Sequence, residues 1–149
     1  MATNLKNLSD YDKSVKYDVS GFSFGIVVAE WNQQITDALF QGAKKVLLEN
    51  GVSEEKIIKI DVPGTFELTF GAKTLADNYN LDAIIVLGCV IQGDTRHFDF
   101  ICNSITQGIT ELNIHYDLPF IFGVLTTENL QQALDRAGGK HGNKGDEAA

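Results

Sequence analysis

Cysteine and positive charge are scarce in this sequence, and each scarcity excludes a class of protein. The two cysteines, Cys89 and Cys102, fall in a predicted buried strand and on the apolar face of a predicted helix. We interpret them as small core residues rather than as a disulfide or a metal-binding pair. Twelve Lys and Arg stand against 20 Asp and Glu, which gives a formal net charge of -8. So acidic a chain is not expected to bind nucleic acid.

Segments that direct a protein into or across a membrane are also lacking. No apolar run reaches the length that crosses a bilayer, and the N-terminus has no basic-then-apolar secretory pattern. We therefore expect a cytoplasmic protein without a membrane partner. The chain has 149 residues, 44% of them hydrophobic, which suits one domain with a substantial core.

Several common site motifs are missing as well. No Gly-x-Gly-x-x-Gly follows a predicted strand, and no Gly-Lys-Ser/Thr ends the glycine-rich residues 138–145. The chain has no Gly-x-Ser-x-Gly, and its three histidines lack the spacing of a zinc site. These absences argue against a dinucleotide fingerprint, a phosphate loop, a serine nucleophile elbow and a metal centre.

What the sequence does contain is a regular alternation of apolar runs and helical patterns. Helices are predicted at residues 35–50, 66–79 and 98–116, and Thr127 can cap a short fourth helix that ends before Gly138. The predicted strands look buried on both faces and span residues 24–30, 57–62, 83–91 and 120–125. This pattern predicts a single α/β domain, residues 24–149, with a four-stranded parallel sheet between two helical layers. Residues 1–23 are polar and aperiodic, so we expect an N-terminal arm.

Chemistry-bearing residues follow the first three predicted strands. The carboxyl ends of parallel strands meet at one edge, so residues 30–32, 63–67 and 92–97 should lie together. That edge would combine the rings of Trp31 and Phe66, the carboxylate of Glu67 and the imidazole of His97, a set that suits a flat polar heterocycle and an anion. A histidine there can move a proton near neutral pH. Individually, the aromatic rings could instead be core residues, Glu67 could favour a helix start, and His97 could cap or pack one.

The few cations are unevenly placed. Between residues 74 and 135 the only one is Arg96, whereas Arg136, Lys140 and Lys144 gather near the C-terminus. Such a cluster in an acidic chain favours a small anionic ligand such as phosphate. The alternative is that these cations offset a helix dipole, which fits Arg136 well and Lys144 poorly.

Five ordered motifs resemble those of the 6,7-dimethyl-8-ribityllumazine synthase family, over residues 24–149. They are Trp31-Asn32 and residues 62–68, 88–99, 122–126 and 136–145. In the last motif the matching residues are 136–138 and 142–145. The resemblance implies a flavodoxin-like, three-layer α/β/α sandwich and a transferase that needs no cofactor. Its implied reaction condenses 5-amino-6-(D-ribitylamino)uracil with 3,4-dihydroxy-2-butanone 4-phosphate. The products are the lumazine, phosphate and water, in the penultimate step of riboflavin biosynthesis.

The resemblance also implies a role for particular residues. His97 is the implied proton carrier. The residues implied to bind the pyrimidine and its ribityl chain are Trp31, Thr65, Phe66, Glu67, Cys89, Val90, Ile91 and Phe122. Those implied to bind the phosphate are Asp94, Thr95, Arg136 and Lys144. In this family Phe122 and Arg136 usually come from the adjoining subunit.

The chain departs from its relatives in a few places. Glu30 stands where arginine is frequent, and Trp31 replaces a common phenylalanine, which preserves stacking. The carboxylate of Asp94 must point away from a bound phosphate, and backbone amides then bind the phosphate. The sequence ends at Ala149, where relatives usually continue a helix.

The resemblance implies a homopentamer, with pentamers assembling into an icosahedral shell because residues 138–145 form a short, uninterrupted turn. Residues 16–19 of the arm could add a strand to a neighbouring subunit. Riboflavin synthase is a further candidate partner. Two alternatives stay open: a flavodoxin-like FMN-binding electron carrier and a non-catalytic shell protein. The first lacks the Ser/Thr-rich loop it would need after the first strand.

Overall fold

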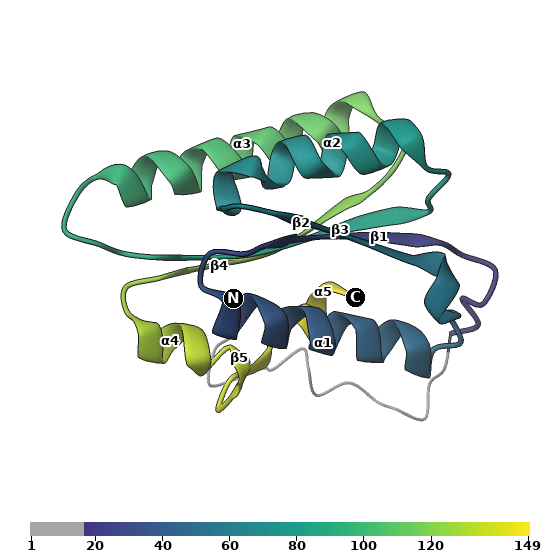
Figure 1. Ribbon diagram of the computed structural model, residues 1–149, viewed down its shortest axis with the longest axis horizontal. Coiled ribbons are helices and arrows are strands. Elements are labelled where there is room, and N and C mark those ends of the chain that lie inside the picture. The colour runs from purple at the N-terminus through teal and green to yellow at the C-terminus, as the bar shows by residue number, and fades with distance from the viewer. Residues whose placement is uncertain (1–16) are drawn as a thin grey trace.

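A four-stranded parallel sheet forms the middle layer of the protein in the computed structural model, which describes residues 17–149. The strand order is β2-β1-β3-β4, with bounds β1 Phe24–Ala29, β2 Ile57–Val62, β3 Ala83–Ile91 and β4 Phe120–Thr127. Figure 1 shows one helical layer above the sheet, α2 (Leu68–Asn78) and α3 (His97–His115). The layer below contains α1 (Gln33–Glu49), α4 (Leu130–Leu134) and α5 (Lys144–Ala148). The predicted three-layer α/β/α fold is therefore confirmed.

Successive residues of the strands build two cores, one on each face of the sheet. On β1, Val27 packs beneath α2 and α3, whereas Ile26 and Val28 pack against α1. The inner strands β1 and β3 are buried along most of their length, but β2 and β4 expose several residues. The prediction that all strands are buried on both faces is thus wrong for β2, in which only Val62 is buried, and holds in part for β4, in which five of eight residues are buried.

The order of the strands creates a switch point between β1 and β3. The chain passes from β1 to β2 on one side and then crosses to β3 on the other. Helix α1, which follows β1, therefore covers one face, whereas α2 and α3 cover the opposite face (Figure 1). Ligands of open α/β sheets bind in the crevice at such a point, beyond the carboxyl ends of the strands.

Several predicted boundaries shift in the structure. Strand β4 continues to Thr127, which stays paired with Ile91 of β3, so Thr127 does not cap the following helix. The cap is Asn129, whose side chain accepts a hydrogen bond from the Gln132 amide at 2.9 Å. His97 is the first residue of α3 rather than part of the preceding turn. Short 3₁₀ turns, Glu54–Lys56 and Thr65–Glu67, precede β2 and α2.

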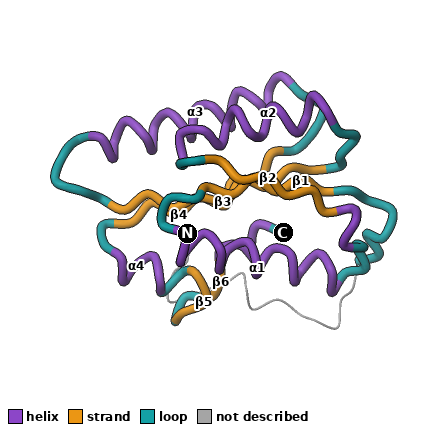
Figure 2. The backbone as a smooth tube through the Cα atoms, in the orientation of Figure 1, coloured by secondary structure: helices purple, strands orange, loops and turns teal. Residues whose placement is uncertain are grey.

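The last part of the chain is more structured than the predicted turn. An antiparallel hairpin of β5 (Ala137–Gly139) and β6 (Gly142–Asn143) leads into α5, beside α1 (Figure 2). The Asn143 amide donates to the carbonyl of Ala38 at 2.9 Å. A methyl group on Gly145 would lie 1.8 Å from the carbonyl oxygen of Leu39, so only glycine permits this close contact.

The predicted arm lies largely outside the described residues. Residues 17–19 form no strand, and Lys16, which begins the predicted edge strand, is not among the described residues. In the part of the chain that the structure covers, no helix is long and apolar enough to cross a membrane.

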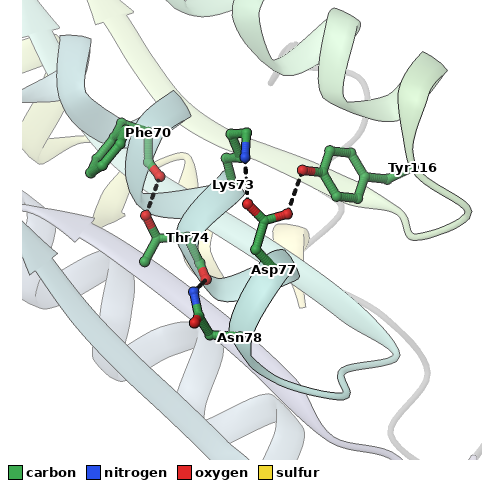
Figure 3. A network of polar contacts seen from close by, with 6 residues as sticks. All are labelled: Phe70, Lys73, Thr74, Asp77, Asn78 and Tyr116. Atoms are coloured by element: carbon green, nitrogen blue, oxygen red, sulfur yellow. Dashed lines mark hydrogen bonds and ion pairs between the residues drawn. The ribbon is translucent and has the colours of Figure 1, made fainter.

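Helices α2 and α3 are joined at their C-terminal ends by a polar network (Figure 3). Lys73 pairs with Asp77, and the hydroxyl of Tyr116 donates to Asp77 at 2.7 Å. These hydrogen bonds, first that of Lys73 and then that of Tyr116, hold the pKa of Asp77 below its ordinary value. Hydrogen bonding to Asp77 in turn raises the pKa of Tyr116. Tyr116 also contacts the Phe120 ring edge-on, at 5.6 Å between centroids.

Candidate active site

A cavity of about 640 Å³ lies at the carboxyl ends of β1, β2 and β3. Its lining combines the three strand exits with the first turn of α3. The lining residues are Trp31, Asn32, Gly64, Thr65, Phe66, Glu67, Cys89, Val90, Ile91, Gly93, Thr95, His97, Phe98 and Ile101. The convergence of the three strand exits, predicted from the strand pattern, is thus confirmed.

Nine of the thirteen candidate site residues line this cavity. They are Trp31, Thr65, Phe66, Glu67, Cys89, Val90, Ile91, Thr95 and His97. The structure therefore gathers in one chain the residues assigned to the pyrimidine and its ribityl chain, with the exception of Phe122. It also places the candidate proton carrier beside them.

Two of the aromatic residues that line the cavity, Trp31 and Phe66, are not core residues. Trp31 is 73% exposed and Phe66 is 55% exposed, although each lines the cavity. Large aromatic side chains left open at a cavity are characteristic of binding sites. Both rings are therefore available to contact a flat ligand.

The turn that carries Phe66 and Glu67 packs directly against β3 at Gly88. Thr65, the first residue of this turn, is buried, and its hydroxyl would lie 3.0 Å from a methyl group placed on Gly88. The same methyl group would lie 2.8 Å from Leu68. Glycine at position 88 consequently lets the turn approach the strand and sets Phe66 and Glu67 at the cavity.

His97 opens α3 and is exposed at the cavity, so it does not pack in the core. Its backbone N–H donates to the Thr95 hydroxyl at 3.3 Å. Phe98 and Ile101, from the same first turns of α3, line the cavity with it. An imidazole held beside a cavity can exchange protons with a bound molecule near neutral pH.

The two cysteines differ in their surroundings. Cys89 is buried as predicted, and burial raises the pKa of its thiol to about 12. Its side chain is therefore neutral near pH 7 and contributes no nucleophile. Cys102 is only half-buried, so the core prediction holds for it in part. Burial, followed by the charge of Asp99, raises the pKa of its thiol as well.

Four candidate residues lie outside the cavity of the single chain. Phe122 is on the edge strand β4 and 39% exposed, and Asp94 is exposed beside the lining residues Gly93 and Thr95. The guanidinium of Arg136 donates to the carbonyl of Gln132 at 2.9 Å. The ammonium of Lys144 pairs with Glu147. Both cations thus already interact with residues three or four positions away in the sequence.

Five lining residues were not among the candidates, namely Asn32, Gly64, Gly93, Phe98 and Ile101. Phe98 and Ile101 were predictable, since Ile101 lies one turn after His97 on the same helix. Asn32 adopts a left-handed backbone conformation, which no sequence periodicity reports. Among residues 17–149, no cluster of three or more His, Cys, Asp or Glu side chains is arranged to hold a metal ion.

A parallel α/β sheet with an imidazole and open aromatic rings at its β1/β3 switch point defines a small-molecule site of the enzymatic kind. The family model of 6,7-dimethyl-8-ribityllumazine synthase matches residues 21–149, and the chain belongs to this family. The family predicted from the motifs is thereby confirmed.

Relatives of this family match the whole chain. A 6,7-dimethyl-8-ribityllumazine synthase of Parabacteroides distasonis is 60% identical over 149 residues, which cover 100% of this chain and 93% of the relative. That of Cytophaga hutchinsonii is 59% identical with the same coverage. That of Flavobacterium johnsoniae is 55% identical, and 78% of its length is covered. These comparisons favour the synthase over both the flavodoxin-like electron carrier and the non-catalytic shell protein.

Proposed function

We propose that the protein is a transferase that condenses 5-amino-6-(D-ribitylamino)uracil with 3,4-dihydroxy-2-butanone 4-phosphate. The observation that carries this proposal is the cavity at the β1/β3 switch point, which brings Trp31, Phe66 and His97 together. Family membership and full-length similarity to lumazine synthases support it. The product, 6,7-dimethyl-8-ribityllumazine, places the reaction in riboflavin biosynthesis.

The aromatic rings and strand ends bind the pyrimidine in this proposal. Trp31 stacks on its flat ring, because the indole is open to the cavity rather than packed in the core. The backbone of residues 89–91 pairs with the ring edge. Thr65, Phe66 and Glu67 hold the ribityl chain, whose hydroxyl groups can donate hydrogen bonds to the Glu67 carboxylate.

His97 moves the protons that the condensation requires. The amine of the pyrimidine attacks the ketone, and loss of water gives an imine. Elimination of phosphate then leaves an enol, which tautomerises to a ketone. The ribitylamino nitrogen closes the ring on this ketone and a second water leaves. Each step takes or returns a proton, which the imidazole at the cavity can accept and donate.

The single chain offers fewer binding groups for the phosphate than for the pyrimidine. No lysine or arginine stands among the described residues that line the cavity. The start of α3 offers backbone N–H groups and a positive dipole end near Asp94 and Thr95. We assign the remaining charge to Arg136 and Lys144 of an adjoining subunit, together with Phe122 as a further wall for the pyrimidine.

A ring of subunits supplies this arrangement, because a head-to-tail interface brings different surfaces of two neighbours together. Large apolar side chains stay exposed on the outer layer of α2 and α3, among them Phe70, Phe100 and Ile114, and they support such an interface. The proposed assembly is a homopentamer, and pentamers form an icosahedral shell. We place the protein in the cytoplasm, with riboflavin synthase as a further partner.

The direct test is to mix both substrates with the purified protein and to follow the absorbance and fluorescence of the lumazine. Because the substrates also react slowly by themselves, an identical mixture without protein is subtracted. Product formation in proportion to protein concentration is the expected result. A stoichiometric flavin spectrum without condensation would instead support the FMN-binding alternative.

A further inference from the structure

Asn32 has a backbone conformation that no other non-glycine residue in positions 17–149 shares. Its φ is 62° and its ψ 43°, in the left-handed region. Side chains on L-residues disfavour this region, and asparagine is among the few that tolerate it. Asn32 occupies it between the end of β1 and the start of α1, at the wall of the cavity.

The side chain of Asn32 also ties this turn to the neighbouring strand. Its amide donates to the carbonyl of Cys89 at 2.9 Å. The paired register of β1 and β3 ends at Val28 and Leu87, before Cys89 is reached. The amide of Asn32 therefore supplies a donor to β3 where β1 has already ended. The carbonyl of Asn32 in turn accepts from Ile35 at 2.8 Å and opens α1.

Trp31 depends on this turn for its position. Its backbone N–H donates to the carbonyl of Pro63 at the exit of β2, at 3.2 Å. Its indole is largely exposed, so core packing does not hold the ring. The backbone of residues 31 and 32 consequently sets the direction of the ring. Hydrogen bonds attach this turn to the ends of β2 and β3, the two strands beside β1.

We propose that Asn32 is a positioning residue for the pyrimidine substrate, an inference that rests on the proposed function. Its left-handed turn aims the Trp31 ring at the cavity, and its amide holds the Cys89 carbonyl at the edge where the pyrimidine pairs. Glycine at this position keeps the turn and loses the hydrogen bond. Aspartate keeps the size and the tolerance of the turn, but its carboxylate faces the carbonyl without a proton to donate.

The test compares Asn32→Gly and Asn32→Asp with Asn50→Gly. Asn50 is a matched control because it flanks the other end of α1, and its amide likewise donates to a backbone carbonyl, that of Val46, at 2.9 Å. Trp31 is the only tryptophan of the chain, so intrinsic fluorescence reports on this ring. Each variant is titrated with the pyrimidine alone while the quenching of this fluorescence is followed, and KM is measured for each substrate.

Both Asn32 variants are expected to weaken binding of the pyrimidine about tenfold, the effect of one lost hydrogen bond. The KM for the butanone phosphate stays near the wild-type value, and the Asn50 variant binds the pyrimidine as the wild type does. If Asn32→Gly unfolds, Asn32→Asp decides the outcome. Asn32 variants that bind the pyrimidine as tightly as Asn50→Gly contradict this inference alone. A wild-type protein that forms no lumazine contradicts the proposed function as well.

Discussion

The cavity and the C-terminal segment, residues 136–149, differ in how far their polar and aromatic groups are already occupied. At the cavity, Trp31 and Phe66 are open to solvent. In the C-terminal segment the cations have partners: Arg136 donates to the Gln132 carbonyl, Lys140 pairs with Asp135 at 3.0 Å, and Lys144 pairs with Glu147. One region is open to ligands, whereas the other is a locally completed structure fastened to α1.

This difference suits a division of substrate binding between the two regions. The cavity has the rings and the imidazole for the heterocycle but no cationic side chain in its described lining. The C-terminal segment has the cations, and it lies with α1 across the sheet from α3 (Figure 1). Neither region alone contains all the groups that we propose for binding both substrates. A site completed between two copies of the chain accounts for both observations.

The largest effect is expected from a change that separates the C-terminal segment from α1. In Gly145→Ala the new methyl group meets the Leu39 backbone at 1.8 Å, and backbone cannot yield as a side chain can. We expect the free energy of unfolding to fall by about 3 kcal/mol, as in severe overpacking. Urea denaturation measures this, with Gly21→Ala as the control, because no atom of the described residues, apart from its two chain neighbours, lies within 4 Å of a methyl group there. An equal effect of the two substitutions would contradict the tight docking of α5.

Removing the imidazole tests the chemistry of the cavity. His97→Ala is expected to lower kcat about a hundredfold, the usual contribution of a general acid–base group. Because His97 is exposed, the melting temperature should stay near that of the wild type. His115→Ala is the matched control, since His115 is exposed at the other end of α3. Some activity remains through binding of the substrates alone. Wild-type turnover of His97→Ala across neutral pH excludes this role.

A substitution in the C-terminal segment tests the proposed anion anchor. Arg136→Lys is expected to raise the KM for the butanone phosphate about tenfold, because lysine cannot form the paired hydrogen bonds of a guanidinium. The KM for the pyrimidine stays unchanged. Lys140→Ala, which removes a cation paired with Asp135, serves as the control. Equal increases in both KM values count against an anchor at Arg136.

The smallest effect is expected far from both regions, in the network of Lys73, Asp77 and Tyr116. Tyr116→Phe removes the hydrogen bond to Asp77 and should lower the melting temperature slightly, without changing kcat or KM. The pKa of Asp77 is lowered by its partners, so its contribution is present above the ordinary carboxyl pKa and is lost as the pH falls through the lowered pKa. The difference from wild type should therefore shrink as the pH falls below the ordinary carboxyl pKa. A difference that persists in acid would assign the effect to packing against Phe120 instead.

The sequence predicts the inner part of this architecture because buried strands appear there as continuous apolar runs. Strands β2 and β3 match their predicted bounds, and β1 differs from its own at one end only. Turn residues such as Pro63 and Gly64 mark where a strand ends. Since parallel strands share a carboxyl edge, the position of the cavity follows from these ends.

Other features leave no such trace. The cap at Asn129 depends on how far β4 stays paired with β3, which is a tertiary property. The β5–β6 hairpin is too short and rich in glycine to show periodicity. The left-handed turn at Asn32 is a backbone conformation of a single residue, which hydrophobic periodicity does not predict. Finally, Arg136 and Lys144 point to an anion by charge, but one sequence does not say which copy of the chain they serve.

The most direct test of the shared site is complementation between two impaired variants. His97→Ala and Arg136→Ala are produced in the same cells in equal amounts, purified as mixed oligomers and compared with each variant alone. If each cavity uses Arg136 of the next subunit, about a quarter of the sites in random assemblies combine an intact His97 with an intact Arg136. The account predicts that condensation recovers to about a quarter of the wild-type rate, well above either variant. A mixture no more active than the average of its two components would contradict it.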